Sequence, residues 1–509
     1  MSAEITYRAS WVEDTDAAIN NAFTPISDAI ASVVFYEVTI AGAAFPLIVG
    51  WLVLAASIFT VTFGFVQFRG FGHALQLVRG KYGSDDDPGE VPHFQALTSA
   101  VSGTVGLGNI AGVAIAVTLG GPGATFWMII AGLLGMCTKF VECTVGVKYR
   151  EVHEDGTVTG GPFKYLPVAF ERFGATAAKL LTGFFAVALF FFGAAGGNMF
   201  QANQALAQAR NVTGGEDGLL GSALASLIFG LVLATLVGLV IIGGIKSIGR
   251  VTSRLVPAMA IFYVLACLTV IILNIGSVPG AFGEIIGGAF SPEGVAGGVV
   301  GVIIIGFQRA AFSNEAGVGS APIAHSAVKT KRPVTEGFVA LLEPFIDTVI
   351  ICTMTALTII IARPQSWLDG RAAVAAGETG PGDGVVLTSD AFASVVPWFP
   401  NVLALAVALF AFSTLITWAY YTQKAWTTVF GRTPRTERTF QLVFLSFTVL
   451  GCLLTLDSVI ATADAMLFAC ALVNILGLYL LLPVVRREFS EYWADRKAGR
   501  LVEKVKADP

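Results

Sequence analysis

The sequence is poor in charge and in the side chains that most enzymes use for chemistry. Only 13% of its 509 residues are charged and four are His, whereas 55% are hydrophobic. A chain with this balance and a mean hydropathy of +0.75 cannot be a soluble globular domain of ordinary composition. We therefore expect most of the chain to lie in lipid.

Several other absences exclude classes of function. The six Cys residues are scattered without CxxC spacing, so the sequence predicts neither a disulfide framework nor a zinc site. There is no GxxxxGK[ST] loop to hold the phosphates of a nucleotide, and no HExxH pair to hold a catalytic metal. The net charge of -4, without a basic patch interleaved with aromatic residues, gives no indication of a nucleic-acid partner. We therefore expect neither an enzyme nor a nucleotide-driven pump.

Long apolar runs are what the sequence has instead. A helix needs about 20 predominantly apolar residues to cross a bilayer. By this criterion the sequence predicts eleven helices, at 42–67, 98–120, 124–148, 178–208, 218–243, 254–275, 297–324, 338–361, 401–423, 439–458 and 464–485. The predicted fold class is an all-α multi-pass membrane protein with 11 transmembrane helices.

The positions of Lys and Arg predict the orientation of these helices. With the N-terminus outside, six cytoplasmic connections hold 25 of the 31 basic residues: 69–97, 148–179, 246–254, 329–332, 424–438 and 486–509. The outside keeps only Arg8, Arg210, Arg363 and Arg371. Because cytoplasmic loops carry the excess of Lys and Arg, we expect a plasma (inner) membrane protein with its N-terminus outside and its C-terminus in the cytoplasm.

Two of the predicted helices contain Gly-rich interruptions. One is Ser102-Gly-Thr-Val-Gly-Leu-Gly-Asn-Ile-Ala-Gly112, and the other is Phe312-Ser-Asn-Glu-Ala-Gly-Val-Gly-Ser320. A helix in lipid tolerates a break only where protein or trapped water satisfies the freed backbone groups. We expect both breaks to face a binding site, although Gly clusters that merely allow close helix packing are the simpler alternative.

The two breaks occupy matching positions in two halves of the chain. Predicted helices 2 to 6 and 7 to 11 form five-helix sets of opposite orientation, each opened by a broken helix, and helix 1 is left over. Inverted repeats with discontinuous helices place the site of a secondary transporter near the middle of the membrane. The predicted organisation is an extracytoplasmic segment 1–41, helix 1 with its cytoplasmic connection 42–97, a first repeat 98–275, a second repeat 297–485 and a basic cytoplasmic tail 486–509.

A family resemblance rests on these same segments. Its main motifs are Thr104-Val-Gly-Leu-Gly-Asn-Ile-Ala-Gly-Val-Ala114, Gly120-Gly-Pro-Gly-Ala124 with Thr138-Lys-Phe-Val-Glu142, and Phe312-Ser-Asn-Glu-Ala-Gly-Val-Gly-Ser-Ala-Pro-Ile-Ala324. The sequence resembles the alanine or glycine:cation symporter family over predicted helices 2 to 9. This resemblance implies the leucine-transporter type of fold of the amino acid/polyamine/cation superfamily. It also implies symport of a small neutral amino acid, alanine or glycine, with sodium by alternating access.

The first break is suited to a zwitterionic amino acid. An ion in the membrane interior needs a partner, so a carboxylate there has to be met by N–H groups. Gly106, Leu107, Gly108 and Asn109 can supply them, because Gly lets the backbone approach closely and the following half-helix presents its positive end. Thr104 is suited to the ammonium group.

Sodium, the expected coupling ion, is a hard cation that prefers carbonyl and hydroxyl oxygens. The candidate ligands are the freed carbonyls of Ser102 and Val105 and the hydroxyls of Ser413 and Thr414 on predicted helix 9. The resemblance implies that helix 9 lies beside the sodium site, and Thr414 is also a candidate for contact with the substrate. The alternative for each hydroxyl is a hydrogen bond to its own helix.

Three more residues are candidates for the pocket wall. Gln201 resembles a family position whose amide contacts the substrate, and Trp418 shares a helix face with Thr414. Phe312, at the second break, is expected to form an apolar wall that limits side-chain size, with Phe307 as a competing choice. The alternatives are an interhelical hydrogen bond for Gln201 and an interfacial anchor for Trp418.

Charged residues inside the predicted helices come in neighbouring pairs: Lys139 with Glu142, Arg309 with Glu315, and Glu343 with Asp347. Such pairs are as often structural or gating elements as substrate ligands, and we expect the former. His325 follows a helix end near the cytoplasm, which favours a capping or surface histidine over a proton relay.

Other transport functions stay open at this stage. Thr104-Val-Gly-Leu-Gly108 resembles a potassium-channel filter superficially, but it occurs once and without a pore-loop layout. A transporter of the same fold for another small solute, or one coupled to protons, is the nearer alternative. The expected partners are a small neutral amino acid, sodium and membrane lipid, and the protein is expected to work as a monomer.

Overall fold

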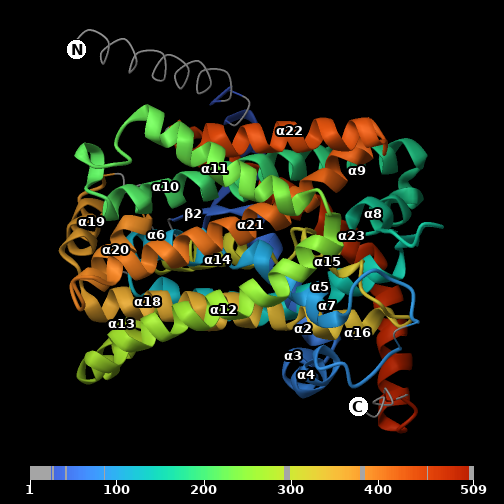
Figure 1. Cartoon of the computed structure of the whole chain (residues 1–509). Coiled ribbons are helices and arrows are strands. Elements are labelled where there is room, and N and C mark those ends of the chain that lie inside the picture. The colour runs from blue at the N-terminus through green and yellow to red at the C-terminus, as the bar shows by residue number, and fades with distance from the viewer. Residues whose placement is uncertain are drawn as a thin grey trace, which may run out of the picture.

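The structure, a computed structural model, describes residues 24–25, 28–40, 43–84, 86–291, 298–378, 384–454, 457–501 and 503. Most of the predicted N-terminal segment and the end of the basic tail lie outside these residues. The described part is a bundle of helices, many of which run in the same direction across Figure 1. Its strands form two short antiparallel pairs, so the all-α class is confirmed.

The first half of the bundle contains helices up to α13. They are α2 (Leu47–Thr62), α3 (Val66–Arg69), α4 (Phe71–Val78), α5 (His93–Thr104), α6 (Ala111–Leu119), α7 (Gly123–Lys148), α8 (Pro162–Phe170), α9 (Ala175–Ala194), α10 (Phe200–Val212), α11 (Ala223–Ile241), α12 (Gly244–Leu273) and α13 (Val278–Phe290).

The second half contains α14 to α23. They are α14 (Gly298–Asn314), α15 (Ala321–His325), α16 (Pro333–Ala340), α17 (Leu342–Pro344), α18 (Thr353–Ala362), α19 (Gln365–Ala375), α20 (Gly384–Ala393), α21 (Phe399–Phe430), α22 (Pro434–Gly451) and α23 (Asp457–Lys497).

The first predicted helix, 42–67, is longer at both ends than the helix in the structure, α2 (Leu47–Thr62). Strand β2 (Ala43–Pro46) pairs with β1 (Glu37–Ile40), and helix α2 begins only after Pro46. Pro favours the start of a helix, because further inside it lacks an N–H to donate and clashes with the preceding turn. The helix ends before Gly64 and Phe65, both of which have positive φ.

Seven helices in the described residues are long and apolar enough to cross a membrane. Two of these, Ala175–Val212 and Pro333–Ala362, contain a π-helical segment and are each counted as one helix. Helices α5 and α6 pass the same test as a pair and are bent by 58° at the break between them. The first predicted interruption is therefore confirmed as a bend in a span. The count of eleven spans and the inverted repeat stay predictions.

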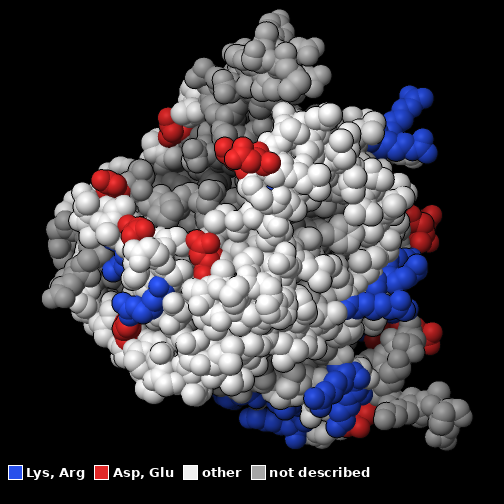
Figure 2. All heavy atoms as spheres, turned by 60° about the vertical axis from the view of Figure 1, so that its left-hand side comes forward, with Lys and Arg blue, Asp and Glu red and all other residues white. Residues whose placement is uncertain are grey.

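The two ends of the bundle differ in charge. We call the end that holds α4, α16 and the C-terminal part of α23 the basic end, and the end that holds α19 and α20 the α20 end (Figure 1). Figure 2 turns the α20 end toward the viewer: Asp and Glu are scattered over this face with a few Lys and Arg among them, whereas larger groups of Lys and Arg lie along the opposite rim and the lower edge.

Helix α20 packs against the start of α6 and against α10 at the α20 end. The Thr388 hydroxyl donates to the Ile110 carbonyl at 3.2 Å, and the Gln208 amide donates to the Ser389 hydroxyl at 3.0 Å. These contacts place α20 against the start of α6, directly beyond the first break.

Candidate functional site

The first break is an extended segment between two half-helices. Gly106 is extended, with φ -139° and ψ -151°, and residues 107–109 form a 3₁₀ turn that leads into α6. The Gly106 N–H donates to the Asn109 side-chain oxygen at 2.9 Å, and the Leu107 N–H donates to the Gln201 side-chain oxygen at 3.1 Å. The predicted break thus presents backbone N–H groups that side chains hold in place.

Gly106 is where the break comes closest to its neighbours. A Cβ at this position would lie 2.5 Å from Oγ1 of Thr414 and 3.1 Å from Oε1 of Gln201. Only Gly allows the backbone to approach these two side chains so closely. This approach brings together α21, α10 and the first break.

The second break follows α14. Glu315 has a positive φ of 55°, which is unusual for a residue with a side chain, and Gly317 and Gly319 both have φ 90°. The Ala316 N–H donates to the Asn314 side chain at 3.0 Å, and the Asn474 amide on α23 donates to the Gly317 carbonyl at 2.9 Å. The freed backbone groups of this break are therefore satisfied by protein.

Two π-helical segments supply further side chains to the same region. The segment η3 (Ala195–Met199) leads into Gln201, whose amide also donates to the Gly196 carbonyl at 3.0 Å. The segment η6 (Phe345–Cys352) carries Asp347. Single π-helical turns inside α-helices occur often at functional sites, because they rotate the following side chains out of the regular helix face.

A small cavity lies where the two breaks meet. Six of the predicted substrate residues line it: Thr104, Gly106, Gly108, Gln201, Phe312 and Trp418. Four lining residues were missed by the sequence reasoning: Gly103, Phe192, Gly196 and Glu315. The space for the centre of a water-sized sphere is about 10 Å³, which is roughly what one water needs. The site is therefore closed around a very small volume.

Aromatic rings form one wall of this cavity. Trp418 is almost fully buried, and its indole N–H donates to the Gly103 carbonyl at 3.2 Å. Phe192 packs edge to face against Trp418 at 4.7 Å and against Phe312 at 6.2 Å. Trp418 therefore lies in the core of the protein, which differs from the interfacial anchor considered for it. Phe192 could not be singled out from the sequence, because it lies in a run of three Phe residues with no distinguishing neighbour.

Three predicted substrate residues adjoin the cavity without appearing in its lining. Leu107 contributes its N–H to Gln201, and the side chain of Asn109 turns toward Asp347. Thr414 is buried, and its hydroxyl makes no hydrogen bond in the structure. A role for these residues in substrate binding stays a prediction.

Two of the residues predicted to bind sodium, Ser102 and Ser413, are in hydrogen-bond contact. The Ser102 hydroxyl donates to the Ser413 carbonyl at 2.7 Å, and the Ser413 hydroxyl donates to the Phe410 carbonyl at 2.9 Å. Thr414 follows with its free hydroxyl, and Val105 caps the end of α5. The Ser102 hydroxyl and the Ser413 carbonyl thus bring oxygen atoms of two helices together, whereas the Ser413 hydroxyl makes the bond to its own helix that was the alternative for it. A role of these residues in sodium binding stays a prediction.

A second oxygen-rich cluster surrounds Asp347. Its carboxylate accepts hydrogen bonds from the amide of Asn109 at 2.6 Å, the hydroxyl of Ser313 at 2.8 Å and the hydroxyl of Thr348 at 2.7 Å. The Asp347 side chain is fully buried. Among the residues that the structure describes, no ion pair reaches it. A buried carboxylate without a cationic partner is costly, so this cluster is suited to a cation.

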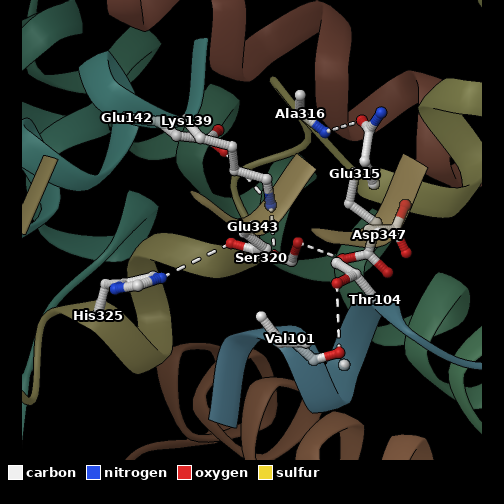
Figure 3. A network of polar contacts seen from close by, with 12 residues as sticks. Val101, Thr104, Lys139, Glu142, Glu315, Ala316, Ser320, His325, Glu343 and Asp347 are labelled. Atoms are coloured by element: carbon white, nitrogen blue, oxygen red, sulfur yellow. Dashed lines mark hydrogen bonds and ion pairs between the residues drawn. The ribbon is translucent and has the colours of Figure 1, made fainter. Parts of the chain in front are cut away.

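Lys139 and His325 form ion pairs across helices with buried carboxylates (Figure 3). Lys139 lies 3.0 Å from Glu343 and 3.8 Å from Glu142, so its closer partner is not its helix neighbour. His325 is fully buried, with Glu336 at 2.5 Å on one side and Glu343 at 3.6 Å on the other. The expectation of a surface histidine is therefore wrong, because α15 packs inside the bundle rather than at its edge.

Within the described ranges, no group of three or more His, Cys, Asp or Glu side chains is arranged to hold a metal ion. A larger cavity of about 390 Å³ lies at the basic end, where Lys164, Tyr420, Lys424, Arg432 and Glu437 contribute to its lining. Its volume falls in the range of small-molecule clefts.

Comparison with known proteins gives the family of this chain. Residues 29–507 match the sodium:alanine symporter family. The chain belongs to this family. The sodium/alanine symporter AgcS of Methanococcus maripaludis is 37% identical over 456 residues, which are 88% of this chain and 94% of that protein. The probable sodium/glutamine symporter GlnT of Bacillus subtilis is 30% identical over 450 residues, 87% of each chain.

A solved structure confirms the type of fold. MhsT, crystallised with L-phenylalanine, aligns with 81% of this chain and 99% of its own at a TM-score of 0.52 and 14% identity. The predicted leucine-transporter type of fold is thus confirmed. The members of the family that are named are secondary transporters, and this chain is a multi-pass membrane protein of the same kind.

Proposed function

We propose that this protein transports a small neutral amino acid, alanine or glycine, together with sodium by alternating access. The observation that carries the proposal is the small closed cavity where both broken helices meet, with an oxygen-rich cluster beside it. The charge difference between the two ends supports an orientation with the basic end in the cytoplasm and the α20 end outside. We also propose the count of eleven spans and the inverted repeat on the evidence of the two breaks.

The size of the cavity favours a small substrate. With Trp418, Phe192 and Phe312 in place, the cavity has room for little more than a water molecule. Alanine or glycine requires only a modest widening, whereas glutamine, named for one relative, requires these rings to move. Pockets of this kind discriminate against each extra methylene by about 1–3 kcal/mol.

The polar groups around the cavity match the two ends of an amino acid. The Leu107 N–H, now held by Gln201, is available to a carboxylate once the Gln201 amide turns aside. Thr104 and Glu315 line the cavity and can receive the ammonium group (Figure 3). For Glu315 this is a change from the expectation based on the sequence, which was a gating or structural role only. Partners for both charges are needed, because an unpaired ion at this depth is expensive.

Two positions are suited to the coupling ion. The Asp347 cluster offers a full negative charge with two hydroxyl oxygens, and the Ser102–Ser413 contact offers neutral oxygens. We propose sodium at the Asp347 cluster, because Asn109 joins that cluster directly to the first break. Binding of the ion there would fix the backbone that meets the substrate. The site predicted at Ser102, Val105, Ser413 and Thr414 remains a second candidate.

The decisive experiment uses purified protein in liposomes. We expect labelled alanine or glycine to accumulate under an inward sodium gradient and not under an equal choline gradient. The uptake should bring in sodium, which a sodium-sensitive dye or ²²Na flux can measure. Equal uptake in both buffers would overturn sodium coupling. Uptake driven instead by a proton gradient would favour the proton-coupled alternative.

Trp418 provides a test of how the cavity selects its substrate. We expect Trp418→Ala to enlarge the wall, so that serine and larger neutral amino acids compete better with alanine by about tenfold, the lower end of the range for one methylene. Competition against labelled alanine measures the change in ranking. Trp418→Phe, which keeps an apolar ring, serves as the matched control. An unchanged ranking in Trp418→Ala would show that this side chain does not set substrate size.

A further inference from the structure

A second cavity, of about 390 Å³, lies at the basic end of the bundle. Its walls come from α8, which Figure 1 shows at this end, the connection from α11 to α12, the C-terminal part of α21, and a hairpin of β3 (Glu151–Val152) and β4 (Val158–Thr159). Among the described residues, it shares no lining residue with the small cavity at the two breaks. It is therefore a separate site, and its walls determine what can bind there.

Two charged residues of this cavity, Lys424 and Glu90, are held by the same residue of the hairpin. The Lys424 ammonium donates to the Val158 carbonyl at 3.1 Å, and the Glu90 carboxylate accepts from the Val158 N–H at 2.8 Å. Neither lies within 4.0 Å of an oppositely charged side chain in the part of the chain that the structure describes. An ammonium group can donate, and a carboxylate can accept, further hydrogen bonds. A cation and an anion are therefore both available to a ligand.

The other Lys and Arg side chains of the lining are already paired. Arg432 lies 3.4 Å from Glu437 and 3.9 Å from Asp155, and Lys164 contacts Glu151. These pairs are partly exposed, and exposed ion pairs contribute little to stability. Lys164 and Arg432 can therefore turn toward a ligand and add to the positive charge around its anionic end.

Part of the lining is apolar and continues onto the surface of the bundle. Ile241, Ile242 and Ile245 contribute it, at the end of α11 and the start of α12. Ile242 is 73% exposed, and only 33% of the most apolar stretch of α11 is buried inside the protein. In a membrane-spanning helix, apolar residues that protein does not cover face the lipid. The cavity therefore borders the lipid at the basic end.

From these features we propose that the cavity binds the headgroup of an aminophospholipid. Lys424 meets the phosphate, Glu90 meets the ammonium group, and the acyl chains lie along the Ile residues toward the membrane. Basic pockets at the cytoplasmic ends of membrane helices bind the headgroups of anionic lipids, and a carboxylate in the pocket adds recognition of an amine. A free amino acid carries the same two charges, but the apolar border toward lipid favours the phospholipid.

Bound lipid would connect elements that are far apart in the sequence. Glu90 lies just before α5, Lys424 lies in α21, and Val158 holds both from the hairpin. A ligand that binds only the folded protein raises its melting temperature. We therefore expect the aminophospholipid to stabilise the basic end, and this binding can be measured without transport.

Native mass spectrometry and thermal unfolding of the purified full-length protein test this site. The probes are phosphatidylethanolamine, phosphatidylcholine and phosphatidylglycerol with identical acyl chains. Phosphatidylcholine keeps the phosphate, but its methylated ammonium cannot donate a hydrogen bond to Glu90, and phosphatidylglycerol has no ammonium. We expect phosphatidylethanolamine to be retained about tenfold more than either, the lower end of what a hydrogen bond to a charged group contributes. It should also give the largest rise in melting temperature.

Three variants locate the binding. Lys424→Gln keeps a donor for the Val158 carbonyl but removes the charge that meets the phosphate, so we expect retention of phosphatidylethanolamine to fall about tenfold. Glu90→Gln should retain phosphatidylethanolamine and phosphatidylcholine equally. Lys179→Gln, at an exposed residue of α9, is the matched control and should behave like the parent. Equal retention of phosphatidylethanolamine by Lys424→Gln and the parent would overturn the site, as would equal retention of the three lipids by the parent.

Soluble zwitterions separate the two sources of the same charges. Phosphoethanolamine and alanine carry an ammonium and an anionic group without acyl chains, and we expect neither to displace the lipid. If either raises the melting temperature of the parent as much as phosphatidylethanolamine does, and Lys424→Gln abolishes that rise, the cavity takes a free zwitterion and the lipid proposal is wrong. If Lys424→Gln does not fold, Glu90→Gln decides: loss of the preference for phosphatidylethanolamine supports the site, and an unchanged preference overturns it.

Discussion

Gly106→Ala should abolish alanine uptake in protein that still reaches the membrane. The added Cβ would lie 2.5 Å from the Thr414 hydroxyl and 3.1 Å from the Gln201 amide oxygen, so the first break has to shift away from α21 and α10. That shift separates the Leu107 N–H from Gln201 and distorts the cavity wall. A displacement of about 1 Å in a binding geometry can cost on the order of a hundredfold in rate. Initial uptake rates normalised to protein in the liposomes measure the effect.

Gly112→Ala is the matched control for this substitution. Gly112 lies in α6, six residues further along, and a Cβ there meets nothing within 4 Å. We expect it to transport like the parent, because Ala also favours a helix more than Gly does. Normal uptake by Gly106→Ala would show that the close approach of the first break is not needed for transport. Equal loss in both variants would point to a general effect of Gly substitution in this helix pair.

The breaks could be predicted from the sequence because Gly clusters in apolar spans have few physical explanations. The residues within them, Thr104, Gly106 and Gly108, therefore fall on the cavity as expected. Gln201 and Trp418 also reach it; the resemblance to a family pointed to Gln201, and the helix face shared with Thr414 pointed to Trp418. Periodicity alone places a side chain on a helix face and does not say which helix that face meets.

Other parts of the site depend on packing that no local pattern encodes. Lys139 pairs with Glu343 across helices rather than with Glu142 on its own helix, and His325 is enclosed between two carboxylates. The sequence of the π-helical segment that carries Asp347 contains no pattern that predicts this type of helix. The sequence offered one clue, a carboxylate inside an apolar span, and the structure adds that this carboxylate has no cationic partner among the described residues.

Asp347 connects the proposed ion site to both broken helices. Asn109 belongs to the first break and Ser313 precedes the second, and both donate to the Asp347 carboxylate, at 2.6 and 2.8 Å. A sodium ion bound to the Asp347 carboxylate and the Ser313 hydroxyl oxygen would balance the buried charge, while the Asn109 N–H would keep its hydrogen bond to the other carboxylate oxygen. The ion would then stabilise the arrangement of the breaks that binds the amino acid. Such a linkage is reciprocal, so the amino acid must strengthen sodium binding by the same factor.

Asp347→Asn should therefore remove most of the sodium dependence of transport. Asn has nearly the same shape, but it lacks the charge that attracts the ion, and loss of one charged hydrogen-bonding partner costs about 1.5–3 kcal/mol, or at least tenfold in sodium affinity. Two measurements check this: the sodium concentration for half-maximal alanine uptake, and the rise in melting temperature on replacing choline with sodium in the absence of substrate.

Asp495→Asn is the matched control. It replaces a carboxylate by an amide in the same way, but at an exposed ion pair with Arg332. It should keep both the sodium response of uptake and the sodium-dependent rise in melting temperature. If Asp347→Asn also keeps both, its carboxylate does not bind the coupling ion. A loss of both in Ser413→Ala instead would place the sodium at the Ser102–Ser413 contact, where the hydroxyl and carbonyl oxygens of two helices already meet. The two variants thus assign the coupling ion to one oxygen cluster or the other.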